Sequence, residues 1–355
     1  MRSFLTDKQE PMRESKLISS FTSVRKSETV AEYGTNSAVR VSPATTPFPT
    51  KTAPVGMLPI TPTATVGGVI FNNVTMEETV SLILLMVQKG DSAQHIVTGN
   101  LDHLFMLQRD ASLRRIYETA ALALPDGAPI VWLSRLKDRT LAAKQEPLQE
   151  RVAGSDLFWE LARASHKTGL RLFFLGGLPS AAEAAAKVVL SRYPKAQICG
   201  TYCPPFETFA TEGERAKIGN LIRDAAPDVL LVGLGAPKQE KWIMANKERL
   251  GVPVSIGVGG TFEMAAGVVR RAPRSFQKFG MEWAYRLLQD PSRLWRRYLR
   301  DDLPFLAQTA GRMVLGLSHP VPSAVPVSAS APASGTETTF GSALLSASPK
   351  VITEL

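Results

Sequence analysis

The sequence predicts an α/β fold, and two observations lead to that class. Between about residues 66 and 265, short and continuously apolar segments alternate with helical segments, which is typical of parallel strands covered by helices on both faces. Three of the apolar segments, at 170–175, 229–233 and 254–258, also pass through a glycine-containing turn into a helix. We therefore predict a Rossmann-like, mostly parallel sheet with helices on both faces, followed by an Arg-rich helical appendage.

The two ends of the chain differ in composition from this central part. Residues 1–65 are rich in Ser, Thr, Pro, Lys and Arg, and residues 313–355 are rich in Pro, Ala and Ser. Neither end holds enough apolar surface to offset the entropy cost of ordering it. We therefore predict disordered tails at 1–65 and 313–355, the α/β domain at 66–265 and a basic amphipathic helical appendage at 266–312.

Charge and composition limit the class of protein. No run reaches the roughly 18 apolar residues that a membrane span needs, and the first residues hold no apolar stretch of signal-peptide length. Cys199 and Cys203 lie four residues apart with no second pair, and we interpret them as reduced thiols of a cytoplasmic protein. The formal net charge of +9 favours an acidic partner: a nucleic acid, a nucleotide phosphate or an anionic membrane surface.

The first predicted elements are a short strand or hairpin at 66–74 and a helix that runs to about Lys89. Thr75 and Glu78, three residues apart, are predicted to form a capping box at the start of this helix. The next predicted elements are a strand at 95–98, a helix at 101–118, a strand at 121–124, a helix at 128–136 and a helix capped by Ser155 that ends at Thr168.

The following elements repeat the order of strand, turn and helix. They are a strand at 170–175, a helix at 181–192, strands at 196–200 and 229–233, a helix from about 239 to 249, a strand at 254–258 and a further helical segment. The turn after 229–233 contains Gly235 and leads to a helix start near Gln239. Backbone N–H groups at such a turn can meet a phosphate, and Lys238 and Glu240 can add charge and hydrogen bonds.

In open parallel sheets, ligands bind beyond the carboxyl ends of the strands, at a topological switch point. The candidates at predicted strand ends are Thr98, Asn100, Asp126, Gly176, Gly177, Lys238, Gln239, Gly259 and Gly260. The pattern also permits glycines that only make turns and an aspartate that only makes a β-turn in Pro-Asp-Gly. No turn matches G-x-G-x-x-G or the P-loop, so hydride transfer and ATP hydrolysis are poorly supported.

Twelve short motifs follow one another in a characteristic order. They are Thr98-Gly-Asn100, Pro125-Asp-Gly127, Arg151-Val-x-Gly154-x-Asp156, Phe174-Leu-Gly-Gly-x-Pro179, Gly233-Leu-Gly-x-Pro-Lys-Gln-Glu240, Gly257-Val-Gly-Gly260, Ala266-Gly267, Arg271-Ala-Pro273, Glu282-Trp283, Arg286-Leu, Pro291-x-Arg293 and Arg296-Arg-Tyr298. Their order and spacing resemble the WecG/TagA/CpsF glycosyltransferase family of bacterial cell-envelope polysaccharide synthesis. The resemblance covers about residues 66–305, and the two tails fall outside it.

This resemblance implies an inverting transferase that moves a sugar from a nucleotide-sugar, usually UDP-linked, to a polyprenyl-diphosphate-linked saccharide at the inner face of the plasma membrane. It implies that Asp126 is the general base, with the polar pair Thr98 and Asn100 beside it. A carboxylate can take the proton of an acceptor hydroxyl, and glycine N–H groups with Lys238 can hold the diphosphate that leaves. The sheet region holds no D-x-D, so we expect neither a metal nor another cofactor.

The resemblance also implies a set of substrate-binding residues, among which Gln239 lies on the donor side. Arg151 is placed on the acceptor side, although an ordinary ion pair with Asp156 fits it equally well. The candidate substrate-binding residues are Thr98, Asn100, Arg151, Gly176, Gly177, Gly235, Lys238, Gln239, Glu240, Gly259, Gly260, Arg271, Arg286, Arg293 and Arg297.

The segment from 267 to 312 holds ten Lys or Arg residues and four acidic residues, a net charge of +6. Leu294, Trp295, Tyr298, Leu299 and Leu303 recur in it at helical spacing. This pattern suits an interfacial helix on an anionic leaflet, but also a helix that packs on the core and exposes a charged face. The resemblance favours the first interpretation and implies that the appendage completes the active site.

Two other function classes remain open. A dinucleotide-dependent oxidoreductase would need the fingerprint glycine loop, and a non-catalytic scaffold would use the basic charge to bind a membrane or nucleic acid. The four histidines, His95, His103, His166 and His319, show no ligand spacing, and we expect none to be catalytic. The expected partners are a UDP-sugar, a polyprenyl-diphosphate-linked acceptor and an anionic inner-membrane surface, with no nucleic acid. Homo-oligomers are a further hypothesis, since self-association would cover apolar surface left where the appendage docks.

Overall fold

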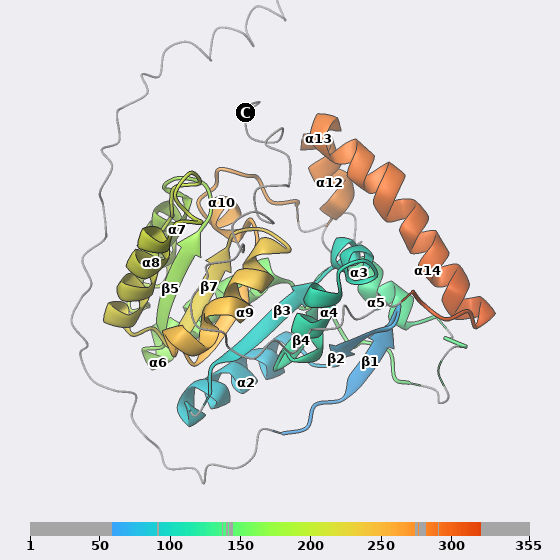
Figure 1. Cartoon of the computed structure of the whole chain (residues 1–355), viewed down its shortest axis with the longest axis horizontal. Coiled ribbons are helices and arrows are strands. Elements are labelled where there is room, and N and C mark those ends of the chain that lie inside the picture. The colour runs from blue at the N-terminus through green and yellow to red at the C-terminus, as the bar shows by residue number, and fades with distance from the viewer. Residues whose placement is uncertain are drawn as a thin grey trace, which may run out of the picture. The chain divides into compact units, whose positions relative to one another are not determined.

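A parallel sheet forms the centre of the fold in this computed structural model (Figure 1). Among the described residues it has six strands in the order β4-β3-β8-β7-β5-β6. These strands are β3 (Gln94–Gly99), β4 (Leu122–Pro125), β5 (Arg171–Gly176), β6 (Gln197–Tyr202), β7 (Val229–Gly233) and β8 (Val254–Gly257). Every neighbouring pair is parallel, which confirms the predicted α/β class.

The structure describes residues 59–90, 92–136, 138–139, 141, 145–273, 276, 282–289 and 291–320. Most of the two predicted tails lies outside these ranges. The first described strand, β1 (Thr63–Val66), begins three residues before the predicted start of the domain and forms an antiparallel hairpin with β2 (Val69–Asn72). The backbone N–H of Ala123 donates to Oδ1 of Asn72 over 2.7 Å, which joins the hairpin to β4.

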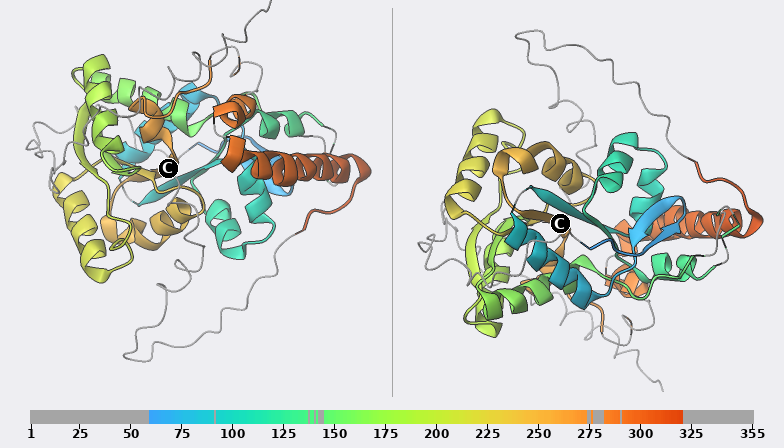
Figure 2. Two further views of the ribbon diagram at one scale, coloured as in Figure 1. Left: turned by 90° about the horizontal axis from the view of Figure 1, so that it is seen from above. Right: turned by 90° about the horizontal axis from the view of Figure 1, so that it is seen from below.

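Helices cover both faces of the sheet (Figure 2), and alternate strand residues point to opposite faces. In β5, Leu172 and Phe174 pack in one core cluster, whereas Phe173 and Leu175 pack in another. The first cluster includes α2 (Met76–Lys89), α6 (Gly154–Thr168), α7 (Ala181–Arg192) and α10 (Thr261–Ala265). The opposite cluster includes α8 (Glu212–Ala225) and α9 (Lys238–Leu250).

A third core cluster lies at the β3–β4 end of the sheet. There Val97 and Ala123 pack with the β1–β2 hairpin and with apolar side chains of nearby helices. These helices are α3 (Leu101–Leu107), α4 (Ala111–Glu118), α5 (Ala128–Ser134) and α14 (Leu303–Leu315). Fully burying a large apolar side chain contributes about 1.5–3 kcal/mol, so this cluster holds the C-terminal helix α14 against the domain.

Local hydrogen bonds explain where the predicted helix boundaries are right and wrong. The capping box at α2 is confirmed, since Thr75 Oγ1 accepts from the N–H of Glu78 and Glu78 Oε2 accepts from the N–H of Thr75. The predicted single helix at 101–118 is wrong, because α3 ends at Leu107 and Asp110 starts a second helix, α4, by accepting from the N–H of Leu113 over 3.0 Å. Helix α8, capped by Thr211, was not predicted.

Ser155 does not cap α6, contrary to prediction. The helix begins one residue earlier, at Gly154, and its N-cap residue Ala153 has no capping side chain. Instead, Oδ2 of Asp126 accepts from the N–H of Gly154 over 3.3 Å. A carboxylate from another loop therefore takes the place of a local cap.

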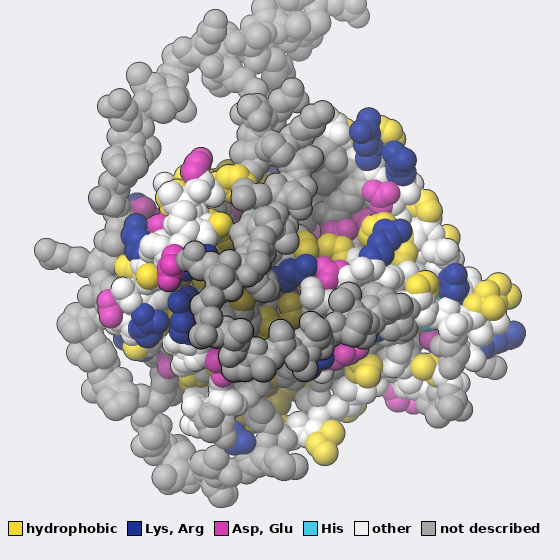
Figure 3. Space-filling view, in the orientation of Figure 1, with side chains coloured by type: hydrophobic (Ala, Val, Ile, Leu, Met, Phe, Trp, Pro, Cys, Tyr) yellow, Lys and Arg dark blue, Asp and Glu magenta, His cyan; other side chains and the backbone are white. Residues whose placement is uncertain are grey.

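The C-terminal segment follows α10 as α12 (Glu282–Gln289), α13 (Pro291–Trp295), the π-helical turn η2 (Arg296–Asp302) and α14. Phe305 and Met313 of α14 are buried, whereas Trp295 and Leu299 are 46% and 49% exposed. Basic and apolar side chains lie side by side along these helices in Figure 3. Within the described ranges, no helix has both the length and the apolar character to cross a membrane.

Candidate active site

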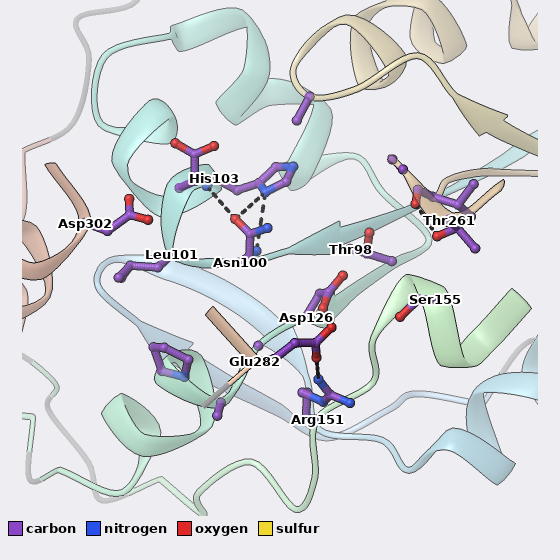
Figure 4. Close-up of a pocket in the computed structure, with 18 of the residues that line it drawn as sticks. Thr98, Asn100, Leu101, His103, Asp126, Arg151, Ser155, Thr261, Glu282 and Asp302 are labelled. Carbon is purple, nitrogen blue, oxygen red and sulfur yellow. Dashed lines mark hydrogen bonds and ion pairs between the residues drawn. The ribbon is translucent and has the colours of Figure 1, made fainter. Parts of the chain in front are cut away.

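A cavity of about 560 Å³ lies at the carboxyl ends of β3, β4, β7 and β8 (Figure 4). Neighbouring strands β3 and β8 lead away to opposite faces of the sheet, to α3 and α10, so the cavity lies at a topological switch point. Its volume is within the range of small-ligand sites. Its polar lining consists of Thr98, Asn100, Asp102, His103, Asp126, Arg151, Ser155, Gln239, Thr261, Glu282 and Asp302.

Asp126 is held at the end of β4 by its backbone. Its N–H donates to the carbonyl oxygen of Gly99 over 2.8 Å, which ties the loop after β4 to the end of β3. Gly127 follows with a φ of 133°, a conformation that L side chains rarely adopt. With Oδ2 near the N–H of Gly154 at the start of α6, a negative carboxylate faces the positive end of a helix.

Thr98 and Asn100 reach the cavity from β3 and the start of α3. The Thr98 hydroxyl donates to the carbonyl oxygen of Gly257 over 3.1 Å and so bridges β3 to β8. Asn100 caps α3, since its Oδ1 accepts from the N–H of His103 over 3.2 Å. A Cβ on Gly127 would lie 3.7 Å from Cβ of Asn100, so Asn100 lies beside the Asp126 loop.

Gln239 connects the turn after β7 to the turn after β8. It is 2% exposed, and its Oε1 accepts from the N–H of Gly259 over 2.9 Å. Its Nε2 donates to Oε1 of Glu240 over 2.8 Å. A Cβ at Gly257 would lie only 2.7 Å from this Nε2, so any other residue there would displace the Gln239 amide. Gln239 therefore fixes the shape of the glycine turn that forms one wall.

A chain of ion pairs lies on the other side of the cavity. Arg151 donates from Nη1 to Oε2 of Glu282 and from Nη2 to Oδ2 of Asp156, both over 2.8 Å. Arg271 Nη2 pairs with the other oxygen of Asp156 at 2.6 Å. Burial acts to lower the pKa of Arg151, but Glu282 and Asp156 outweigh it and raise that pKa above its ordinary value.

The structure places eight of the predicted site residues in the cavity lining. They are Thr98, Asn100, Asp126, Arg151, Gly235, Gln239, Gly259 and Gly260. The ion pair between Arg151 and Asp156, one of the two interpretations of Arg151, is present. The side chains of Arg286, Arg293 and Arg297 lie outside the described part of the structure.

Five other candidates lie outside the lining. Gly176 ends β5, and Gly177 follows it. A Cβ on Gly176 would lie 2.7 Å from the carbonyl oxygen of Gly233, so glycine allows the turns after β5 and β7 to approach each other closely. Lys238 Nζ lies 5.6 Å from the centre of the Phe206 ring. Glu240 contacts the lining residue Gln239. Arg271 pairs with Asp156, which is also a partner of the lining residue Arg151.

Several lining residues were not singled out as substrate contacts in the sequence. His103 and Asp302 are buried, and Glu282 pairs with Arg151. Glu282 and Asp302 come from the C-terminal helices, and only tertiary packing brings them to the sheet. For His103 a weak signal existed, since it stands three residues after the helix-capping residue Asn100.

The cysteines and acidic side chains give no indication of a metal site within the described residues, where no group of three or more His, Cys, Asp or Glu has a metal-binding arrangement. Cys199 and Cys203 are both unpaired thiols. Burial raises the pKa of Cys199 to about 11, and it also raises the pKa of Cys203.

Comparison with known proteins gives one consistent result. A sequence model of the glycosyl transferase WecG/TagA/CpsF family matches residues 64–316. A curated relative from Bacillus subtilis (strain 168) is 33% identical over 204 residues, which is 58% of this chain and 74% of the relative. A relative from Staphylococcus aureus (strain MW2) is 31% identical over 231 residues, 64% of this chain and 85% of the relative. Both are named N-acetylglucosaminyldiphosphoundecaprenol N-acetyl-beta-D-mannosaminyltransferase.

Proposed function

The chain belongs to the glycosyl transferase WecG/TagA/CpsF family and is a glycosyltransferase, and we propose that it transfers a sugar from a UDP-sugar to a polyprenyl-diphosphate-linked saccharide with inversion. The names of the relatives make N-acetylmannosamine the first sugar to consider and N-acetylglucosaminyldiphosphoundecaprenol the first acceptor. The observation that carries the proposal is the carboxylate of Asp126 in a cavity at the switch point of the sheet. The product is a lipid-linked saccharide of cell-envelope synthesis.

Asp126 is the general base of this reaction. Its carboxylate takes the proton of the acceptor hydroxyl, and the hydroxyl oxygen attacks the anomeric carbon of the donor. The bond from that carbon to the diphosphate oxygen breaks, and UDP leaves with the electron pair. Inversion follows from a single attack on the face opposite the leaving group. A hydrogen bond from Gly154 to Oδ2 and the N-terminus of α6 keep the carboxylate in place.

The donor diphosphate binds at the glycine turns after β7 and β8. Gly235, Gly259 and Gly260 line the cavity there, and turns of this kind can present backbone N–H groups to phosphate oxygens. Gln239 holds the second turn through the N–H of Gly259. Such preorganised donors stabilise the negative charge that develops on the leaving group.

The acceptor enters from the opposite, more apolar side. Pro129 and Trp132 of α5 face this side together with Leu303 and Leu306 of α14. Trp295 of α13 and Leu299 of η2, in the segment that precedes α14, are exposed apolar side chains. Together with the net charge of +6 on residues 267–312, they support a peripheral position on the anionic inner face of the plasma membrane, where the lipid-linked acceptor would be presented.

A donor panel tests the proposal. The full chain in detergent is given UDP- and GDP-sugars, with and without N-acetylglucosaminyldiphosphoundecaprenol, and nucleotide release is followed. We expect release of UDP from one sugar that rises strongly when the acceptor is present. If every nucleotide-sugar fails to bind and to react while the protein is folded and the lipid is present, the proposal is wrong and a non-catalytic scaffold is the better account.

A further inference from the structure

A buried side chain of the cavity lining and one behind it form an unusual polar pair. His103 comes from α3 and Glu240 from α9, and their side chains are only 7% and 1% exposed. Nε2 of His103 lies 3.6 Å from Oε1 of Glu240, which makes an ion pair whenever the imidazole is protonated. Burying polar groups costs free energy unless they are paired, so packing alone does not explain why a histidine and a glutamate occupy these two buried positions.

On one side, the backbone and the ring of His103 together fix the orientation of the Asn100 amide. The backbone N–H of His103 can only donate, so the atom of Asn100 that it meets at 3.2 Å must be the oxygen, Oδ1. Nδ1 of His103 lies 2.9 Å from the same oxygen. Two acceptors at that distance would repel each other. The backbone N–H of Asn100 also points at Nδ1, but over 3.4 Å, so the shorter contact decides, and we assign to Nδ1 a proton that it donates to Oδ1. Figure 4 shows this contact beside the label of Asn100.

On the other side, the pair fixes the orientation of the Gln239 amide by the same logic. The N–H of Gly259 can only donate, so Oε1 is the atom that faces it at 2.9 Å. Nε2 must then donate to Oε1 of Glu240 over 2.8 Å. Polar contacts therefore lead from the turn after β8, through Gln239, to Glu240, and from His103 to Asn100 at the end of β3. The 3.6 Å approach of His103 to Glu240 joins the two parts and is longer than a hydrogen bond.

We propose that His103 and Glu240 are positioning residues for sugar transfer, which hold the amides of Asn100 and Gln239 with their oxygens turned into the protein. The inference rests on the proposed function. Among the described residues, Nδ2 of Asn100 has no hydrogen-bond acceptor. Asn100 therefore offers N–H donors to the cavity beside Asp126, and it can bind an oxygen of the substrate, such as a sugar hydroxyl or a phosphate oxygen, while Asp126 accepts a proton.

The opposite tautomer of His103 would undo this arrangement. A lone pair on Nδ1 could accept from the backbone N–H of Asn100, which lies 3.4 Å away, but it would also face Oδ1 of Asn100 at 2.9 Å. The amide would then have to rotate and give up its bond to the N–H of His103. The tautomer is thus a signature of the positioning role, and it can be measured without substrate. His95 supplies an internal reference of the opposite kind. Its Nε2 lies 2.9 Å from the carbonyl oxygen of Ile116 and must carry the proton.

The first experiment is a long-range ¹H–¹⁵N spectrum of the imidazoles in the full chain, with His103 assigned by its loss in His103→Gln. We expect a proton on Nδ1 of His103, whereas the ring of His95 carries its proton on Nε2. A His103 ring with no proton on Nδ1 overturns the inference. Because no donor or acceptor is needed, this result stands even if the chain fails to transfer any sugar.

The second experiment compares two substitutions in the transfer assay with N-acetylglucosaminyldiphosphoundecaprenol. His103→Asn keeps a donor near the place of Nδ1, whereas His103→Gln keeps a polar group near the place of Nε2 and loses the donor to Asn100. We expect His103→Asn to stay within about threefold of the wild-type kcat, and His103→Gln to lose about tenfold or more in kcat with little change in KM, as a misplaced group does.

Equal kcat values for the two variants overturn the inference, provided that both unfold at the wild-type temperature. For Glu240, the variant Glu240→Gln keeps an acceptor for Gln239 and is expected to retain more activity than the apolar Glu240→Leu. The reverse order contradicts the role of Glu240. If a variant fails to fold, the tautomer in the wild-type protein decides the matter.

Discussion

Replacing Asp126 by Asn removes the proposed base with little change in shape. The amide cannot take a proton, but the loop is kept by the 2.8 Å hydrogen bond from the N–H of residue 126 to Gly99. A positioned general base contributes about 10²- to 10⁴-fold, so kcat should fall by that factor. At about 1.4 kcal/mol for each factor of ten, the barrier rises by about 3–5 kcal/mol. KM should stay within about threefold.

The same substitution should affect folding far less. The oxygen of the Asn amide can still accept from the N–H of Gly154, which lies 3.3 Å from Oδ2 in the wild type. Loss of a negative charge at the N-terminus of α6 costs about 0.3–1 kcal/mol. The free energy of unfolding should therefore change by about 1 kcal/mol or less.

The assay is the initial rate of sugar transfer at saturating donor and acceptor, with thermal unfolding measured on the same samples. Asp224→Asn, an exposed change on α8 far from the cavity lining, is the matched control, and it should behave as wild type. A folded Asp126→Asn protein with kcat within about threefold of wild type would refute the assignment of the base.

Three further predictions concern stability, thiol chemistry and the membrane. Burial raises the pKa of Asp110, but the hydrogen bonds from Lys241, Ser112 and the N–H of Leu113 together outweigh it and bring that pKa down to about 2. The ionised carboxylate therefore stabilises the fold above the ordinary pKa of 3.8. For this partly exposed group, Asp110→Asn should cost about 1 kcal/mol at pH 7 in urea unfolding, a loss that fades as the pH falls toward 2, and a constant loss would contradict it. Cys199, with its pKa raised to about 11 by burial, should react with a thiol reagent at pH 8 only after unfolding, so Cys199→Ala should leave native labelling unchanged. The double variant Trp295→Ser, Leu299→Ser removes two half-exposed apolar side chains and should weaken binding to anionic vesicles by about 2 kcal/mol, roughly 30-fold; unchanged sedimentation with vesicles would argue against membrane contact there.

The sequence was informative about the strands because strands buried on both faces are continuously apolar. Val229–Gly233 and the helix at 181–192 were predicted with their observed bounds. Helix boundaries were less predictable where a tertiary contact replaced a local cap. Asp126 accepts from the N–H of Gly154, and no pattern near residue 155 contains that information.

The candidate site was predictable where a residue lies within a few positions of the end of a strand that reaches the cavity. Asp126, Asn100 and Gly259 satisfy this rule and line the cavity. Gly177 follows a strand too, but β5 lies beyond β7 in the sheet, and the order of strands cannot be read along the chain. Asp302 reaches the cavity only because the C-terminal helices pack against the domain, a long-range contact without a local signal.

The most direct test of the central claim follows the sugar itself. UDP-sugars labelled in the sugar are incubated with the full chain and N-acetylglucosaminyldiphosphoundecaprenol, and the label is followed into the lipid phase. The proposed function predicts that one sugar enters the lipid fraction only when enzyme and acceptor are both present, with an anomeric configuration opposite to that in the donor. Label that stays in the aqueous phase with every donor, while the protein is folded, would contradict it.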